Sequence, residues 1–168
     1  MPTTQREIRY LTAAELVRLR RLSDARALQA RERDTVGAVR AWAFLDTLLS
    51  SGLRAPEVAA LRIGDCLLGY GETSLVVRHR KSYKEREVFI PEELKRHLKA
   101  FITWKRDRGE DVSDPTPACT GQRELLIQNG VWRTVKRLIA AVGLDPRYAT
   151  HSCRHSYATL SIERAGST

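Results

Sequence analysis

Three short groups of residues carry the side chains best suited to chemistry, and they lie far apart in the sequence. They are Arg54 with Glu57 in SGLRAPEVAALRIGD, Lys81 with Lys84 in RKSYKER, and His151 with Arg154 in HSCRHSYATL. Guanidinium and imidazole groups bind phosphate oxygens, and a lysine whose pKa is lowered can donate a proton. Taken together, the three groups predict chemistry at a phosphate.

The spacing of the first and third groups places cations where an anion can reach them. Arg54 precedes a short helix that should begin near Pro56, so its guanidinium and the free helix amides can meet the same anion. Glu57 can orient that guanidinium through a bidentate pair. His151 and Arg154 share one face near the first turn of a helix. The alternative for Arg54 and Glu57 is a surface ion pair worth under ~1 kcal/mol. For the two lysines it is a solvated turn that blocks edge aggregation, and for His151 and Arg154 it is a satisfied helix-start histidine beside a surface arginine.

The pattern around these groups predicts an α+β protein that is mainly α, with a small antiparallel β-sheet or hairpin. The expected helices begin at a Thr12–Glu15 capping box, near Val36, near Pro56, at Pro91, near Val131 and at a Thr150 cap. Gly52 and Gly143 are the expected C-terminal caps of two of them. The β-branched runs TSLVVRH and REVFIP predict two paired strands, and residues 111–122 predict a surface loop.

The composition favours a polyanionic partner. The chain has 168 residues, the size of one domain, and a formal net charge of +9, which makes nucleic acid the leading candidate. Its cysteines, Cys66, Cys119 and Cys153, lack CxxC spacing and predict reduced thiols rather than disulfides or a zinc site. No run approaches the ~20 apolar residues of a membrane span, and no signal peptide is present. The sequence therefore predicts a cytoplasmic, nucleoid-associated protein.

The three segments resemble the signature motifs of the tyrosine recombinases, the phage integrase family. SGLRAPEVAALRIGD is similar to TGLR-x-x-E-L-x-x-L-x-x-x-D, RKSYKEREVFIP to G-K-G-x-K-x-R-x-x-P-L, and THSCRHSYAT to H-x-L-R-H-x-F-A-T. RYLTAAEL resembles the entry to the family's catalytic domain. The resemblance extends from about Tyr10 to Gly166. It implies the family's DNA breaking-rejoining fold, with residues 1–168 forming one partial catalytic domain.

The resemblance also implies roles for these residues in DNA strand cleavage and rejoining, without a metal ion or cofactor. Arg54 and Arg154 would clamp the non-bridging oxygens of the scissile phosphate, and Lys81 would donate a proton to the 5′-oxygen. His151 would hydrogen-bond the phosphate and assist proton transfer, while Glu57 would support the first arginine. Duplex DNA is the implied partner, and the other hairpin side chains expected to contact it are Arg80, Lys84 and Arg86.

Departures from the motifs change what is expected of the chain. Arg80 and Ser82 stand where the family has glycines, so Lys84 remains an alternative to Lys81. The family's nucleophilic tyrosine has no counterpart in this sequence, and neither has its N-terminal DNA-binding domain. Tyr157 stands at a phenylalanine position of the family and is expected in the core.

We therefore expect a fragment of a site-specific recombinase or integrase of a mobile element, whose full-length form self-associates on DNA. Its nucleophile would come from outside these residues, in cis or from a partner subunit. The alternatives are a non-catalytic DNA-binding remnant or modulator and a type IB topoisomerase-like protein.

Overall fold

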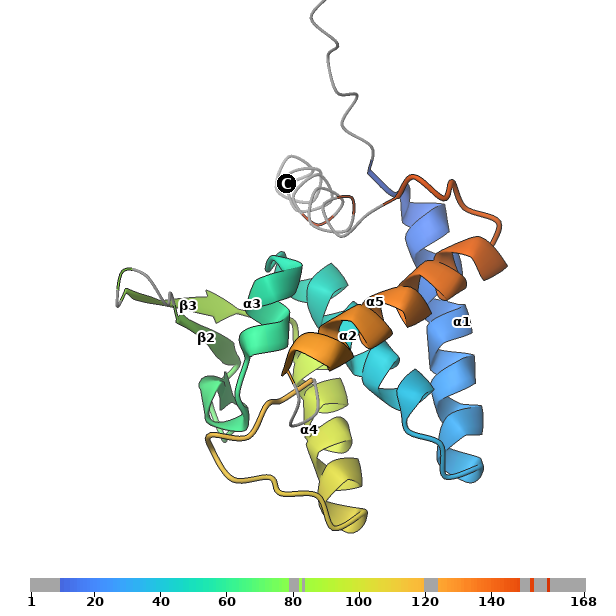
Figure 1. Cartoon of the computed structure of the whole chain (residues 1–168). Helices are drawn as coiled ribbons and strands as arrows, with labels where there is room; N and C mark the ends of the chain where they lie inside the picture. Colours follow the sequence, from blue (N-terminus) through green and yellow to red (C-terminus); the bar gives the residue numbers. More distant parts are fainter. Residues whose placement is uncertain are drawn as a thin grey trace, which may run out of the picture.

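A computed structural model gives the arrangement of the chain. It describes residues 10–78, 82, 84–119, 124–148, 152 and 157, with the backbone alone for 124–131. Its elements are α1 (Ala13–Glu32), α2 (Gly37–Ser51), α3 (Ala55–Ala60), the 3-10 turn η1 (Ile63–Asp65), β1 (Cys66–Leu67), β2 (Ser74–Arg78), β3 (Glu85–Phe89), α4 (Glu92–Asp107) and α5 (Glu124–Ala141). Helices make up most of the molecule and the small sheet lies at one side, which confirms the predicted class (Figure 1).

Capping residues fix the ends of the first two helices. The Thr12 hydroxyl accepts a hydrogen bond from the Glu15 amide at 3.3 Å, and the Glu15 carboxylate accepts one from the Thr12 amide at 2.8 Å. This is the predicted capping box, which satisfies two helix-start amides at once. α2 ends at Gly52, whose φ of +68° lies in the left-handed region that favours glycine. Both predictions are confirmed.

The centre of the fold is α2. It contacts α1, α3, α4 and α5, and in Figure 1 these helices surround it. Of its 15 residues, 12 are buried, because apolar side chains such as Phe44, Leu45 and Leu48 occupy all of its faces. The turn that follows α2, which carries Arg54, is therefore attached to the most enclosed helix of the described chain.

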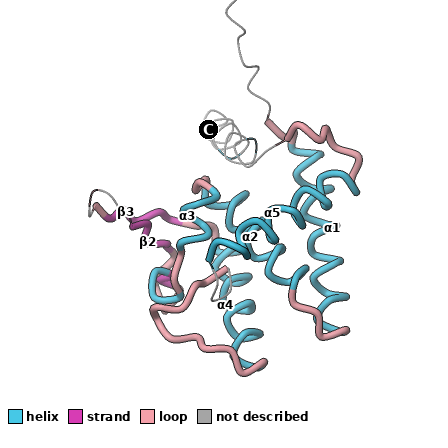
Figure 2. Tube along the Cα trace, viewed as in Figure 1, coloured by secondary structure: helices cyan, strands magenta, loops and turns pink. Residues whose placement is uncertain are grey.

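The sheet is antiparallel, with strand order β1-β2-β3. β2 pairs with β3 from Ser74 opposite Phe89 to Arg78 opposite Glu85, which confirms the predicted strand pairing. Figure 2 shows the β2–β3 ribbon extending away from the helices. The sequence predicts no strand at Cys66–Leu67, because two residues carry too little alternation to be recognised.

Two predicted boundaries are wrong. α5 begins at Glu124, seven residues before the expected start at Val131. The described part of the expected surface loop, residues 111–119, ends in the core, because Ala118 and Cys119 are each 1% exposed. Lys105 of α4 is buried with them, and its ammonium donates to the carbonyl of Pro117 at 2.8 Å. This hydrogen bond joins the end of the loop to α4.

Two of the cysteines and the predicted cap at Gly143 lie among the described residues. Cys66 and Cys119 are free thiols, and burial raises the pKa of the Cys119 thiol to about 11. Gly143 has a φ of +70° after α5, as a C-terminal cap requires. Cys153 and the Thr150 cap lie outside the described residues. None of the helices that the structure describes is long and apolar enough to cross a membrane.

A buried carboxylate connects three helices. Asp46 of α2 is only 7% exposed and accepts a hydrogen bond from Arg20 of α1 at 2.7 Å. Its second oxygen lies 2.7 Å from Nδ1 of His97 in α4. The hydrogen bond to Asp46 raises the pKa of His97, and burial opposes this effect without cancelling it. Asp46 thus joins side chains from two other helices, Arg20 of α1 and His97 of α4.

Candidate active site

Arg54 is held at the start of α3 by its backbone. Its amide donates to Oε2 of Glu57 at 2.8 Å, and the amide of the buried Leu53 donates to Oγ of Ser51 at 3.3 Å. The Arg54 side chain is exposed, and no hydrogen bond or ion pair among the described residues engages its guanidinium. A fixed backbone with an available guanidinium is the arrangement that binding an external anion requires.

The bidentate partner of Glu57 is Arg86 of β3, where the sequence predicted Arg54. Oε1 of Glu57 lies 3.0 Å from Nη1 of Arg86, and Oε2 lies 3.1 Å from Nη2. Burial disfavours the Glu57 carboxylate, but hydrogen bonds from Arg86 and from the Arg54 amide outweigh it and lower the pKa of Glu57. Glu57 therefore supports Arg54 through the backbone and joins α3 to the hairpin.

Only part of the predicted site lies among the described residues. Lys84 is exposed directly before β3, and Arg86 is on β3 with its guanidinium on Glu57. The residues outside the described chain are Arg80, Lys81, His151 and Arg154. Their places in the site remain predictions.

Tyr157 shows where the last motif meets the rest of the molecule. Its partly buried ring lies against Gly52: a Cβ atom added at Gly52 would be 2.5 Å from Cδ1 and 2.8 Å from Cε1 of the ring. The expected packing role of Tyr157 thus has a specific partner, the glycine two residues before Arg54. Sequence reasoning did not find this pair, because no local pattern relates positions 52 and 157.

A lysine clamp anchors the chain just before the HxxR motif. Nζ of Lys136 in α5 donates to the carbonyls of Pro146 and Tyr148, at 2.6 and 2.7 Å. The Tyr148 hydroxyl in turn donates to Oε2 of Glu15 at 3.2 Å, in the capping box of α1. The clamp (Lys136, Pro146, Tyr148) fixes the chain three residues before His151. No sequence pattern indicates this clamp, because every residue has a carbonyl acceptor.

Replacing Lys136 by methionine should lower the free energy of unfolding by about 1–2 kcal/mol, because two charge-assisted hydrogen bonds are lost from a partly exposed site. The matched control is Lys99→Met on the exposed face of α4, which should change stability by less than ~0.5 kcal/mol. Urea unfolding followed by circular dichroism measures both. Equal effects of the two substitutions would show that the clamp does not anchor the chain.

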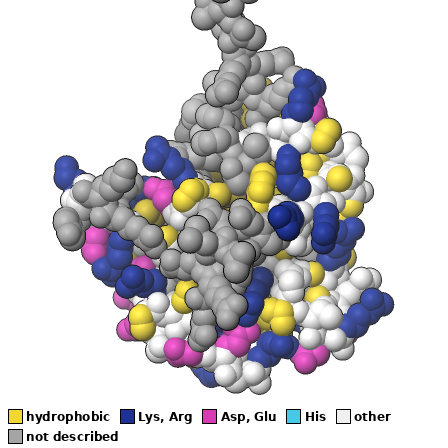
Figure 3. Space-filling view, in the orientation of Figure 1, with side chains coloured by type: hydrophobic (Ala, Val, Ile, Leu, Met, Phe, Trp, Pro, Cys, Tyr) yellow, Lys and Arg dark blue, Asp and Glu magenta, His cyan; other side chains and the backbone are white. Residues whose placement is uncertain are grey.

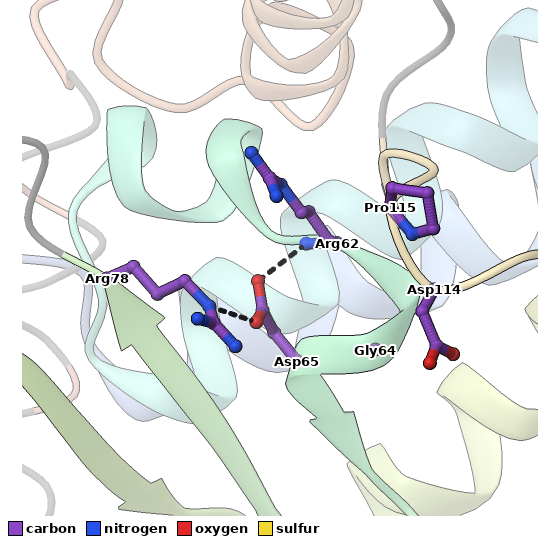
Figure 4. Close-up of a pocket in the computed structure, with 6 residues that line it drawn as sticks. All are labelled: Arg62, Gly64, Asp65, Arg78, Asp114 and Pro115. Carbon is purple, nitrogen blue, oxygen red and sulfur yellow. Dashed lines mark hydrogen bonds and ion pairs between the residues drawn. The ribbon is translucent and has the colours of Figure 1, made fainter.

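An open pocket of about 280 Å³ lies beside the start of the sheet. Figure 4 shows Arg78 of β2 directed at Asp65, whose Oδ1 it meets at 2.7 Å, while Oδ2 of Asp65 accepts from the Arg62 amide at 3.1 Å. The remaining lining residues are Gly64, Asp114 and Pro115. Its two arginines and two carboxylates balance, so this pocket lacks the excess of positive charge that a phosphate site needs.

Positive charge on the visible face is not confined to one element. In Figure 3, Lys and Arg side chains appear both on the sheet side and over the helices at the opposite side. No group of three or more His, Cys, Asp or Glu side chains that could hold a metal ion occurs within the residues that the structure describes. Among the described residues, Glu57 links the Arg54 turn to one further cationic group, the guanidinium of Arg86 on β3.

Comparison with protein families identifies the chain. The model described as "Phage integrase family" matches residues 9–166. The chain belongs to the phage integrase family. The resemblance of the three motifs to this family is thereby confirmed.

Similar relatives of this integrase-family chain are tyrosine recombinases. XerA of Saccharolobus solfataricus is 34% identical over 120 residues, which are 70% of this chain and 35% of the relative. XerD of Oceanobacillus iheyensis is 31% identical over 130 residues, or 75% and 42% of the two chains. XerC of Xanthomonas axonopodis pv. citri is 31% identical over 157 residues, or 93% and 46%. The integrase-family chain thus spans less than half the length of these curated relatives.

Solved structures share the fold. A crystal structure of XerA recombinase matches with a TM-score of 0.70 and 23% identity, over 94% of this chain and 51% of that one. The XerH site-specific recombinase bound to its difH substrate matches with a TM-score of 0.69 and 22% identity, over 92% and 43%. These likenesses confirm the recombinase fold of the integrase-family chain. The relatives and solved structures named above are recombinases, which does not favour the topoisomerase-like or non-catalytic alternatives.

Proposed function

We propose that this chain is the part of a site-specific tyrosine recombinase that binds duplex DNA and holds its scissile phosphate. The observation that carries the proposal is the Arg54 turn. Its backbone is fixed by Glu57, while its exposed guanidinium has no partner among the described residues. A preorganised guanidinium whose N–H groups remain available stabilises charge developing on a phosphate. The net charge of +9 supports a polyanionic partner.

The remaining roles are proposed from the motifs. Arg154 completes the clamp on the non-bridging oxygens, and His151 hydrogen-bonds the same phosphate. A tyrosine hydroxyl from outside these residues attacks the phosphorus and forms the phosphotyrosyl bond, while His151 assists the removal of the hydroxyl proton. The bond to the 5′-oxygen breaks, and Lys81 gives that oxygen a proton. Such a proton transfer is typically worth 10²–10⁴-fold in rate. Two arginines can supply the charge that other phosphoryl-transfer enzymes obtain from metal ions.

The hairpin supplies further DNA contacts in this proposal. Arg80 and Lys84 contact the phosphate backbone of the duplex. Arg86 contacts it as well while paired with Glu57, because the Arg86 side chain is 41% exposed in that pair. The full-length protein self-associates on DNA and is nucleoid-associated in the cytoplasm. Charge-driven DNA binding of this kind depends strongly on salt.

The test is binding of the 168-residue chain to a short labelled duplex, followed by fluorescence anisotropy between 50 mM and 200 mM salt. We expect affinity to fall steeply with salt. Arg54→Ala should weaken binding about tenfold at 0.1 M salt and lower the slope of log affinity against log salt by about one, the loss of one phosphate contact. An affinity that stays flat with salt, or an Arg54→Ala slope equal to that of the unsubstituted chain, would contradict the proposal.

The matched control is Arg106→Ala, an exposed arginine in the last turn of α4. Figure 1 shows this end of α4 away from α3, so the control should change the slope much less than Arg54→Ala. A nicked suicide duplex should yield no covalent adduct with these residues alone. An adduct that disappears in Tyr157→Phe would instead make Tyr157 the nucleophile.

A further inference from the structure

Gly52 differs from the other left-handed glycines that the structure describes. Gly71, Gly109 and Gly143 have φ values of +76°, +77° and +70°, and nothing lies within 4 Å of a Cβ added to any of them. At Gly52 the same added atom would overlap the ring of Tyr157, with three ring carbons at 2.5, 2.8 and 3.3 Å. The aromatic ring therefore lies directly against the backbone at this one turn.

The ring supports the Arg54 turn from a third direction. Behind the turn, Oγ of Ser51 donates to the carbonyl of Thr47 at 2.6 Å and accepts from the amide of Leu53. Ahead of it, Glu57 accepts from the Arg54 amide. These contacts come from α2 and α3, which adjoin the turn in sequence. Tyr157 is more than 100 residues away from Gly52 and supplies a long-range contact at the same place.

Chain connectivity relates this contact to the second arginine. Arg154 is three residues before Tyr157, and three extended residues span at most about 11 Å. Gly52 and Arg54 are two residues apart, or at most about 7 Å. The Tyr157 ring therefore contacts the turn that leads to Arg54, and Arg154 is at most about 11 Å of chain away from Tyr157.

We infer that Tyr157 is a positioning residue, whose ring on Gly52 fixes the turn that carries Arg54. The inference rests on the proposed function, because it names how the phosphate clamp of that function is aligned. The atoms of Tyr157 that contact the turn are ring carbons, Cδ1, Cε1 and Cγ. Phenylalanine should therefore replace tyrosine, whereas leucine should not.

The salt slope of DNA binding separates positioning from plain loss of structure. Partial unfolding lowers the concentration of active protein, but the slope reports the number of phosphates contacted. We expect Tyr157→Leu to lower the slope by about one and affinity by about tenfold at 0.1 M salt, as Arg54→Ala does. Tyr157→Phe should restore the slope of the unsubstituted chain. The double variant Arg54→Ala/Tyr157→Leu should bind like Arg54→Ala alone, because both remove the same contact.

The outcomes distinguish this inference from the proposed function. If Arg54→Ala lowers the slope but Tyr157→Leu does not, or if the two effects add, Tyr157 does not position Arg54 and the proposed function stands. If Arg54→Ala leaves the slope unchanged, both are wrong. Urea unfolding establishes which variants are folded at the assay temperature. Should Tyr157→Leu fail to fold, Tyr157→Met is tested in the same way, because the flexible methionine side chain fills space without a ring.

Discussion

Replacement of Gly52 by alanine is expected to lower the free energy of unfolding by about 3 kcal/mol or more. A φ of +68° costs a residue with a Cβ about 1–2 kcal/mol. The new methyl group would also lie 2.5 Å from Cδ1 of Tyr157, and such overpacking costs typically 1–3 kcal/mol. Urea unfolding followed by circular dichroism measures the sum of the two penalties.

Gly143→Ala is the matched control, because Gly143 has a φ of +70° with open space around its Cβ direction. It should cost only the backbone penalty, about 1–2 kcal/mol. In a chain that already carries Tyr157→Ala, Gly52→Ala should cost about as much as Gly143→Ala, since the overlap is gone. Equal costs at positions 52 and 143 in the otherwise unsubstituted chain would refute the contact between Gly52 and Tyr157.

Asp46→Asn should destabilise the protein by about 2–3 kcal/mol near neutral pH. The carboxylate is buried and engages Arg20 and His97, and removing one partner of a buried ion pair costs about 3–5 kcal/mol. The estimate is lower here because the Arg20 side chain is 34% exposed and regains water. Asp107→Asn, at an exposed end of α4, is the matched control and should stay within about 0.5 kcal/mol.

The cost of Asp46→Asn should also depend on pH. Because the pKa of His97 is raised above its ordinary 6.5, protonated His97 stabilises the fold below that pH, and the stabilisation is lost as pH rises through the folded pKa. The charged groups that act on His97 are Asp46, Glu93 and Asp24. Urea unfolding at about pH 5.5 and about pH 8.5 should therefore show the larger cost at the lower pH. A cost that grows toward high pH would exclude the Asp46–His97 pair as its source.

Features set by neighbouring residues follow directly from the sequence. The Thr12–Glu15 capping box, the left-handed cap at Gly52 and the pairing of β2 with β3 each depend on residues close in the chain. Local steric and hydrogen-bonding rules are sufficient for such features. The same holds for the hydrogen bond between the Arg54 amide and Glu57, three residues apart.

The start of α5 shows where local rules fail. Gln128, Asn129 and Gly130 precede the predicted start, and asparagine and glycine are poor helix formers, so the sequence places a break there. The helix nevertheless begins at Glu124. Tertiary context overrides a propensity difference of less than about 1 kcal/mol per residue. The burial of Cys119 after a loop with two prolines has the same origin, since the Lys105 hydrogen bond draws that chain inward.

The contacts that complete the candidate site are long-range, and that is why the sequence could not specify them. Arg86 is 29 residues from Glu57, so their pairing depends on how the hairpin lies against α3. The Lys136 clamp uses backbone carbonyls, which every residue possesses. The residue types of the site could be predicted from the sequence because binding a phosphate needs cationic side chains. The long-range contacts of these residues, such as that of Glu57 with Arg86, depend on elements that only the folded chain brings together.

The burial of α2 has a consequence for how the molecule opens. Hydrogen exchange in folded proteins proceeds through local fluctuations, and a helix enclosed on all sides is exposed only when the whole domain unfolds. α2 is such a helix, with 12 of 15 residues buried, and the Arg54 turn follows directly from its last residue. The loops around it can fluctuate without releasing that end of the helix. The Arg54 guanidinium, which we propose binds the phosphate, is thus attached to the end of a helix that is exposed only on global unfolding.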